Sequence, residues 1–150
     1  MLKTNLDSTD VKILKYLLAD ARLSGRQMAR SVGVSVGTAI SKVKKMQREG
    51  IIKGYSARLN HEKLGYELTA VTEITVSKGR LLDTEKEIAK ISNVCAVYDV
   101  TGLIDAIVIA KFKTRKALSQ YTKTLLALPF VERTNTHIVL TTIKEDYRLI

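Results

Sequence analysis

The spacing of apolar residues changes along the chain. In the first fifty residues they recur every three or four positions, which predicts helices over residues 7–20, 24–32 and 35–49, the first capped by Asp7. From residue 66 onward, short alternating or apolar runs predict strands, and helical spacing returns twice between them. This change of period predicts two domains of different class, joined by an extended hinge over residues 51–63.

The ends of the second and third predicted helices carry strong boundary signals. Ser24 is a good N-cap, and Gln27 three residues later completes a capping box. Gly33 suits the left-handed residue that ends a helix, Ser35 caps the next helix, and Gly50 ends it. Two capped helices joined by so short a turn predict a helix-turn-helix.

The third predicted helix has two distinct sides when it is projected at 3.6 residues per turn. Its apolar side, which is expected to pack on the other helices, consists of Val36, Ala39, Ile40, Val43 and Met46. Its opposite side consists of Thr38, Ser41, Lys45 and Arg48, with Gly37 beside them and Lys42 and Lys44 on the flanks. Small hydrogen-bonding residues therefore precede cations, as in a recognition helix whose first turns meet base edges and whose later cations reach phosphates. A basic solvated helix face is the alternative interpretation.

The net charge of +10 is concentrated in the part that holds the helix-turn-helix. Residues 1–60 contain 12 Lys and Arg against 4 Asp and Glu, a net +8, whereas residues 61–150 contain 13 against 11, a net +2. This distribution predicts a polyanionic partner, double-stranded DNA. An anionic membrane surface is the alternative, but no helix pairs a basic face with exposed Trp or Phe.

The candidate DNA-binding residues follow from the helix faces and the charge. Arg26 and Arg30 precede the turn, on the helix that crosses the DNA backbone in such folds, and solvated surface arginines are their alternative interpretation. The full candidate set is Arg26, Arg30, Ser35, Val36, Gly37, Thr38, Ser41, Lys42, Lys44, Lys45 and Arg48.

The second half of the chain predicts a ferredoxin-like sandwich. Strands are predicted over residues 68–76, 94–100, 105–112 and 131–143, and helices over residues 81–92 and 114–128, the second ended by Pro129. The order βαββαβ is that of the ferredoxin-like fold. The predicted class is therefore α+β: an N-terminal three-helix, winged-helix-like domain over 1–50, the hinge over 51–63, and the sandwich over 64–150.

Several of the predicted strands are apolar on both faces, although helices in this fold cover only one face. Ile107 and Ile109 alternate with Ala106, Val108 and Ala110 on the third predicted strand. A second copy of the same sheet is the simplest cover, so we expect a homodimer through this domain.

Little in the sequence indicates an enzyme or a metal protein. His61 and His137 lie far apart with no Cys or carboxylate at ligand spacing, and the chain has no phosphate-binding glycine loop and no nucleophile elbow. No apolar run approaches a membrane span. Cys95, the only cysteine, lies in the apolar run 94–97 and is expected to be a small buried hydrophobe, compatible with a reducing cytoplasm.

Several motifs together resemble the Lrp/AsnC (feast/famine) family of transcription regulators, over nearly the whole chain. The resemblance to the DNA-binding half of that family is carried by Leu6, Asp7, Asp10, Ile13, Leu14, residues 24–33, Val34, Ser35, Val43, Gly50, Ile51, Ile52, Gly54 and Tyr55. The resemblance to its second domain is carried by Leu64, Gly65, Thr101, Gly102 and Asp105. The resemblance implies dimers that associate further, often to octamers, amino-acid effectors bound near the Thr-Gly-x-x-Asp turn, and a location on the prokaryotic nucleoid in the cytoplasm.

The chemistry of that turn suits a free amino acid. Asp105 could accept the ammonium group, and backbone N–H groups around Gly102 could hold the carboxylate. The candidate effector-binding set is Thr101, Gly102, Leu103, Ile104, Asp105, Thr134 and Thr136, with no other cofactor expected. The alternative for Asp105 is a turn residue that bonds its own backbone.

Three functions are therefore open on the sequence. The first is a transcription regulator that responds to a small effector. The second is a small enzyme or an amino-acid-binding module with an incidental basic N-terminus. The third is a non-specific DNA-compacting protein. The uneven charge and the ordered face of the third predicted helix favour the first.

Overall fold

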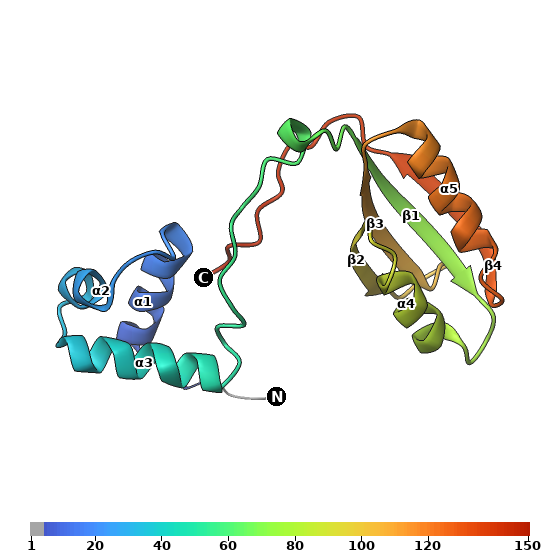
Figure 1. Cartoon of the computed structure of the whole chain (residues 1–150). Coiled ribbons are helices and arrows are strands. Elements are labelled where there is room, and N and C mark those ends of the chain that lie inside the picture. Colours follow the sequence, from blue (N-terminus) through green and yellow to red (C-terminus); the bar gives the residue numbers. More distant parts are fainter. Residues whose placement is uncertain (1–4) are drawn as a thin grey trace. The chain divides into compact units, whose positions relative to one another are not determined.

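The computed structural model describes residues 5–150 and divides the chain into two compact units. One unit runs to Arg58 and includes the last six residues, Glu145–Ile150, and the other spans Leu59–Lys144. The contribution of the C-terminal residues to the first unit was not expected from the sequence. Figure 1 shows a helical unit and a sheet-containing unit, and each is described by itself below. The division into a DNA-binding domain over 1–50, a hinge over 51–63 and a sandwich domain over 64–150 stays a prediction.

The first unit contains three helices, α1 (Ser8–Ala19), α2 (Gly25–Val32) and α3 (Val36–Arg48). The predicted local boundary signals are confirmed. The Ser24 hydroxyl accepts the Gln27 N–H and the Gln27 side chain accepts the Ser24 N–H, which completes a capping box. Gly33 has φ 79°, a left-handed conformation that favours glycine, so α2 ends there and α3 can begin at once.

The core of the first unit is small, and it leaves part of α3 uncovered. Its buried apolar residues are Ile13, Leu14, Met28, Ala29, Ala39 and Met46. The prediction that the whole apolar side of α3 packs inward is wrong for Val36 and Ile40, which remain 39% and 41% exposed. The physical reason is that α1 and α2 are too few to cover so broad an apolar stripe.

The second unit is the predicted ferredoxin-like sandwich. A 3₁₀ turn at Glu62–Leu64 leads into β1 (Leu68–Val76), α4 (Leu81–Ala89), β2 (Val94–Asp99), β3 (Ala106–Phe112), α5 (Arg115–Leu126) and β4 (Val131–Ile138). The strands form one antiparallel sheet in the order β2-β3-β1-β4. The last strand ends at Ile138 rather than at residue 143, because its partner β1 begins at Leu68 and no strand continues beyond it.

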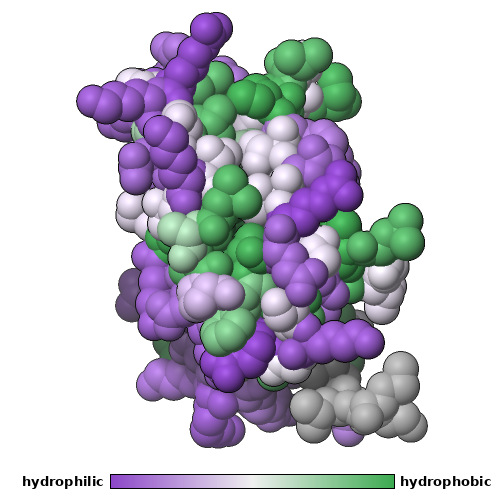
Figure 2. All heavy atoms as spheres, turned by 90° about the vertical axis from the view of Figure 1, so that its right-hand side faces the viewer, coloured by the Kyte–Doolittle hydropathy of each residue, from purple (hydrophilic) through white to green (hydrophobic). Residues whose placement is uncertain are grey.

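Both helices cover the same face of this sheet. Ile88 of α4 and Leu125 of α5 pack in one buried cluster with residues of β1 and β3, among them Ile74 and Phe112. Neither of the two helices described in this unit lies on the opposite face, where apolar Val71, Ile107 and Ile109 are only half-buried. Figure 2 shows one face of the molecule, where groups of apolar side chains interrupt a hydrophilic surface.

Cys95 is exposed, so the prediction of a buried cysteine is wrong. It lies at an irregularity in β2, where the pairing with β3 shifts register between Val94 and Ala96. A bulge interrupts the alternation of the strand, so an apolar run in the sequence does not fix which of its members are covered. Among the described helices, none is long and apolar enough to cross a membrane.

Candidate nucleic-acid interface and effector turn

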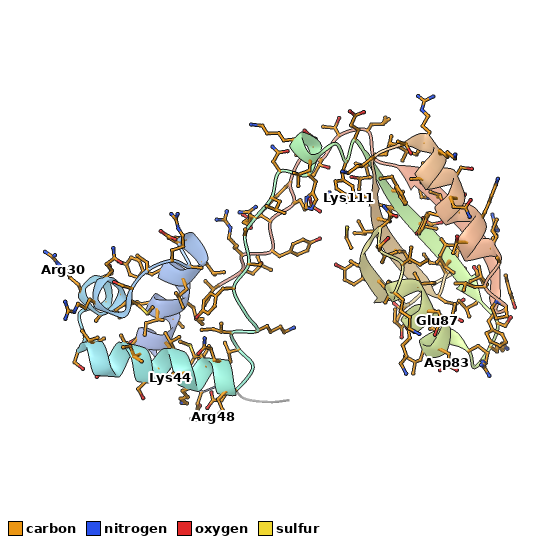
Figure 3. The ribbon with its side chains drawn as sticks, viewed as in Figure 1. Arg30, Lys44, Arg48, Asp83, Glu87 and Lys111 are labelled. Carbon is orange, nitrogen blue, oxygen red and sulfur yellow. The ribbon has the colours of Figure 1, made fainter. Side chains whose placement is uncertain are left out.

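The solvent side of α3 presents a row of cations next to small residues. Gly37, Ile40, Ser41, Lys44, Lys45 and Arg48 line a shallow depression of about 500 Å³. Lys44 and Arg48 are four residues apart and therefore lie on the same side of the helix, as Figure 3 shows. Gly37 and Ser41 line the N-terminal part of this surface, and Lys44, Lys45 and Arg48 line its C-terminal part.

The start of α3 is held by two hydroxyl groups. The Ser35 hydroxyl accepts the Thr38 N–H at 3.1 Å and lies 2.8 Å from the Thr38 hydroxyl. Both side chains therefore fix the first turn of the helix while remaining exposed. Their hydroxyl groups can still bond a second partner, because each oxygen both donates and accepts.

Lys42 differs from the other candidate cations because it joins α3 to α1. Its ammonium group lies 2.5 Å from the Asp7 carboxylate and 3.0 Å from the Asp10 carboxylate, and Asp10 is buried. The Lys42 hydrogen bond lowers the pKa of Asp7 to about 2, and the same bond raises the pKa of Lys42. Lys42 thus orients α3, and its charge is largely neutralised by two carboxylates.

We predict that Lys42→Met lowers the unfolding midpoint of the chain by about 4–8 °C, because it leaves the buried Asp10 carboxylate without its cation. The pKa of Asp7 is depressed in the folded state, so the contribution of the pair is complete above pH 4 and is lost as the pH falls through about 2. Thermal unfolding of both proteins between pH 2 and 7 measures the difference.

Lys44→Met is the matched control for that comparison, because no described residue pairs with Lys44, which is exposed. It should leave the midpoint within about 2 °C of wild type, as expected for a surface substitution. A Lys42→Met midpoint equal to that of the control at pH 6 would show that the link between α1 and α3 contributes nothing to stability.

Arg26 and Arg30 are both exposed on α2. Figure 3 shows Arg30 projecting away from the helix into solvent. The unit therefore presents cations from two consecutive helices, as a helix-turn-helix does when one helix crosses the DNA backbone and the next enters the groove.

The turn between β2 and β3 is held against the end of β1 by Asp105. Its carboxylate accepts the Val76 N–H at 2.8 Å, and its own N–H donates to the Ile74 carbonyl at 2.9 Å. Its carbonyl also accepts the Val100 N–H, which closes the turn. Asp105 therefore has a structural role, because it holds the β2–β3 turn against β1. Only one of its two carboxylate oxygens bonds to the backbone.

The rest of the turn faces solvent. Thr101, Gly102 and Leu103 are exposed, whereas Ile104 is half-buried. Gly102 has φ 130°, a value that residues with a side chain rarely adopt. The exposed backbone of this turn is available for contact with a ligand or with another chain.

The structure does not bring Thr136 to this turn within one chain. Thr134 and Thr136 lie on β4 and pair with Ile74 and Thr72, so β1 separates them from the β2–β3 turn. The Thr136 hydroxyl lies 3.2 Å from the Thr72 hydroxyl, which also accepts the Tyr121 hydroxyl from α5. A role for either threonine in effector binding stays a prediction.

Sequence reasoning missed a polar group on the uncovered sheet face. The Asn135 amide donates to Glu73 at 3.0 Å and lies 3.1 Å from the His137 ring, and His137 lies 3.6 Å from Glu73. The spacing of two between Asn135 and His137 on one strand places them on the same face, which was the available signal. Their pairing with Glu73 required the register of β4 against β1.

A second hollow, of about 580 Å³, lies between α4 and the segment before β4. Leu128, Pro129 and Phe130 form one wall, and the Arg80 guanidinium lies 4.2 Å above the Phe130 ring. Asp83 and Glu87, labelled in Figure 3, line it from α4. Among residues 5–150, no group of three His, Cys, Asp or Glu side chains could hold a metal ion.

The chain matches two family models. Residues 6–53 match a winged helix-turn-helix DNA-binding model, and residues 69–149 match the Lrp/AsnC ligand binding domain. An uncharacterised HTH-type transcriptional regulator of Pyrococcus furiosus is 45% identical over 96% of this chain and 97% of its own. The leucine-responsive regulatory protein of Haemophilus influenzae is 31% identical over 97% of this chain and 90% of its own.

Solved structures of transcription regulators are also similar to this chain over nearly its whole length. The feast or famine regulatory protein of Mycobacterium tuberculosis, complexed with L-methionine, is similar with a TM-score of 0.87 and 29% identity, covering 95% of this chain and 97% of its own. A transcriptional regulator of Neisseria meningitidis in complex with L-methionine is similar with a TM-score of 0.88 and 27% identity, covering 97% of this chain and 96% of its own.

Proposed function

We propose that this chain, which belongs to the Lrp/AsnC family of transcription regulators, reads duplex DNA with α3 and adjusts that binding to an amino acid held at the β2–β3 turn. The observation that carries the DNA part is the solvent side of α3, where small polar residues precede Lys44, Lys45 and Arg48. A cationic surface of this order fits the major groove and its flanking phosphates.

The candidate DNA-binding residues fall into groups according to what each would contact. Gly37, Thr38 and Ser41 belong to the turns that meet base edges, and Ser35 and Val36 stand at the helix start. The exposed cations Arg26, Arg30, Lys44, Lys45 and Arg48 contact phosphates. Lys42 acts mainly as a positioning residue, because its ammonium group is already paired with Asp7 and Asp10.

Selection from a randomised duplex pool by the full-length protein tests the DNA part. We expect enrichment of a sequence with two half-sites, and hydroxyl-radical footprinting should place their centres about 34–36 Å apart, one helical turn, as for other dimeric helix-turn-helix proteins. Equal recovery of all sequences would instead identify a non-specific DNA-compacting protein.

The effector part is supported by the turn and by the two methionine complexes of similar proteins. Asp105 keeps one carboxylate oxygen beyond its bond to Val76, and that oxygen can accept an ammonium group. The backbone N–H groups of the exposed residues around Gly102 can donate hydrogen bonds to a carboxylate. A thermal-shift screen over the twenty amino acids identifies the effector; no shift with any of them would remove this part of the proposal.

The assembly that we propose is a homodimer through the uncovered sheet face, with further association to a larger oligomer such as an octamer. Val71, Ile107 and Ile109 lie half-buried on that face, and neither α4 nor α5, the helices described in this unit, covers them. A second sheet packed there removes this apolar surface from water at about 25 cal/mol per Å².

We predict that Ile109→Lys raises the dimer dissociation constant at least tenfold, because it places an ammonium group in the centre of the proposed interface. Sedimentation or light scattering of the full-length protein measures the change. Leu126→Lys is the matched control, since Leu126 is an exposed leucine on α5, which packs on the other face. Unchanged assembly of Ile109→Lys, with intact folding by circular dichroism, would place the interface elsewhere.

A further inference from the structure

The least expected feature of the DNA-facing surface is apolar. Ile40 is 41% exposed and Val36 is 39% exposed, although both belong to the side of α3 whose Ala39 and Met46 are buried. Ile40 shares the shallow depression on α3 with Ser41, Lys44 and Arg48. Its side chain therefore lies among the groups proposed to contact DNA, one helical turn before Lys44.

The first residue of α2 is shaped to receive this side chain. A Cβ atom built on Gly25 would lie 3.0 Å from two carbon atoms of Ile40 and 3.8 Å from a methyl carbon of Val36. Contacts at 3.0 Å are tighter than ordinary van der Waals contact, so a larger residue at position 25 must shift the Ile40 side chain by a few tenths of an ångström. Gly25 thus lets Ile40 and Val36 lie together against the start of α2.

The cations around Ile40 and Val36 indicate what kind of molecule this apolar pair contacts. Lys44, Lys45 and Arg48 lie beside it in the same depression, and Arg26 and Arg30 are exposed on α2. These cations attract a polyanion such as DNA. They would add nothing to the binding of an uncharged apolar protein segment. Among the groups on the floor of the major groove, the C5 methyl of thymine is the apolar one.

We propose that Ile40, with Val36 beside it, is a specificity-determining residue that packs against thymine C5 methyl groups. The half-sites of the DNA bound by this chain then carry thymine at the position that faces Ile40. This inference rests on the proposed reading of DNA by α3 and adds the chemical identity of the base that is read.

The test replaces thymine by deoxyuridine, one position at a time, in a duplex selected from a randomised pool by the full-length protein. Deoxyuridine keeps every hydrogen-bonding group of thymine and lacks only the methyl group. We expect one position per half-site at which the replacement weakens binding about fourfold, the value of one buried methyl group. Ile40→Ala should bind the thymine duplex more weakly and lose the sensitivity to deoxyuridine at that position.

Leu18→Ala is the matched control, because Leu18 is 38% exposed in the same unit but lies on α1. It should keep the full deoxyuridine effect. Gly25→Ala is a second variant that does not shorten Ile40 but displaces it, and it should reduce the deoxyuridine effect while the protein stays folded by circular dichroism. If Ile40→Ala folds poorly, the wild-type duplex scan still shows whether a thymine methyl group is read, and Gly25→Ala then decides whether Ile40 reads it.

The outcomes separate this inference from the function on which it rests. A selected sequence that is bound equally well with deoxyuridine at every position would overturn the role of Ile40 and leave sequence-specific binding intact. An unchanged deoxyuridine effect in folded Ile40→Ala would do the same. Failure to select any sequence would overturn both.

Discussion

Replacing Lys44 and Arg48 together by alanine should weaken the binding of duplex DNA about a thousandfold at 0.15 M salt. In the proposed dimer the double variant removes four phosphate contacts, and each counts for roughly a factor of five at that salt concentration through counterion release. No described residue pairs with either cation, and both lie on the solvent side of α3 (Figure 3). Their loss should therefore not be masked by a rearranged ion pair.

The salt dependence gives a sharper readout than affinity alone. The slope of log K against log salt should fall by about 3.6 in the double variant, which is 0.9 for each lost phosphate contact. Fluorescence anisotropy with specific and random duplexes at several salt concentrations measures it, and both duplexes should be affected alike. Lys12→Ala with Lys15→Ala, an equal loss of charge on α1, is the control. An equal effect of the control would mean that net charge, and not the α3 surface, binds DNA.

Replacing Asp105 by asparagine should weaken binding of the amino-acid effector about tenfold to a hundredfold. This loss of affinity corresponds to one hydrogen bond between charged groups. That bond is weakened when the carboxylate is replaced by a neutral amide. Asparagine is the informative substitution because its side-chain oxygen can still accept the Val76 N–H, the bond that holds the turn against β1. Asp105→Ala would remove that bond as well, and would therefore confuse binding with local stability.

Isothermal titration calorimetry of the amino acid into wild type and Asp105→Asn measures the difference. Asp99→Asn is the control, because Asp99 is an exposed carboxylate at the end of β2, near the same turn. The affinity for DNA without effector should be unchanged in both variants, since the proposed DNA contacts belong to the other unit. Equal amino-acid affinity in Asp105→Asn and wild type would leave Asp105 with the structural role alone.

The ends of the first helices could be predicted because the signals that determine them are local. Asp7, Ser24 and Ser35 bond to N–H groups two or three residues away, and Gly33 needs only its own backbone conformation. The strands β1 and β3 were equally predictable, because their alternating apolar residues repeat the period of a pleated strand. The βαββαβ order then limits the topology to few choices.

The features that were missed depend on contacts between distant residues. The pairing of Lys42 with Asp7 and Asp10 joins residues more than thirty positions apart, so a helical projection could only place Lys42 on a flank. The same projection assigned Ile40 to the apolar side correctly, but it could not count the neighbouring helices available to cover that side. For Asp105 the turn was found, whereas its bond to Val76 requires the register of β1 against β3.

The affinity of the full-length protein for its selected duplex, measured with and without the amino acid found by the thermal-shift screen, tests the central claim most directly. A regulator with linked sites should change its affinity for this duplex by about fivefold or more in the presence of the amino acid. The same change should be absent in Asp105→Asn. An affinity that is identical with and without a bound amino acid, together with equal binding of a scrambled duplex, would contradict the account of a ligand-responsive, sequence-specific regulator.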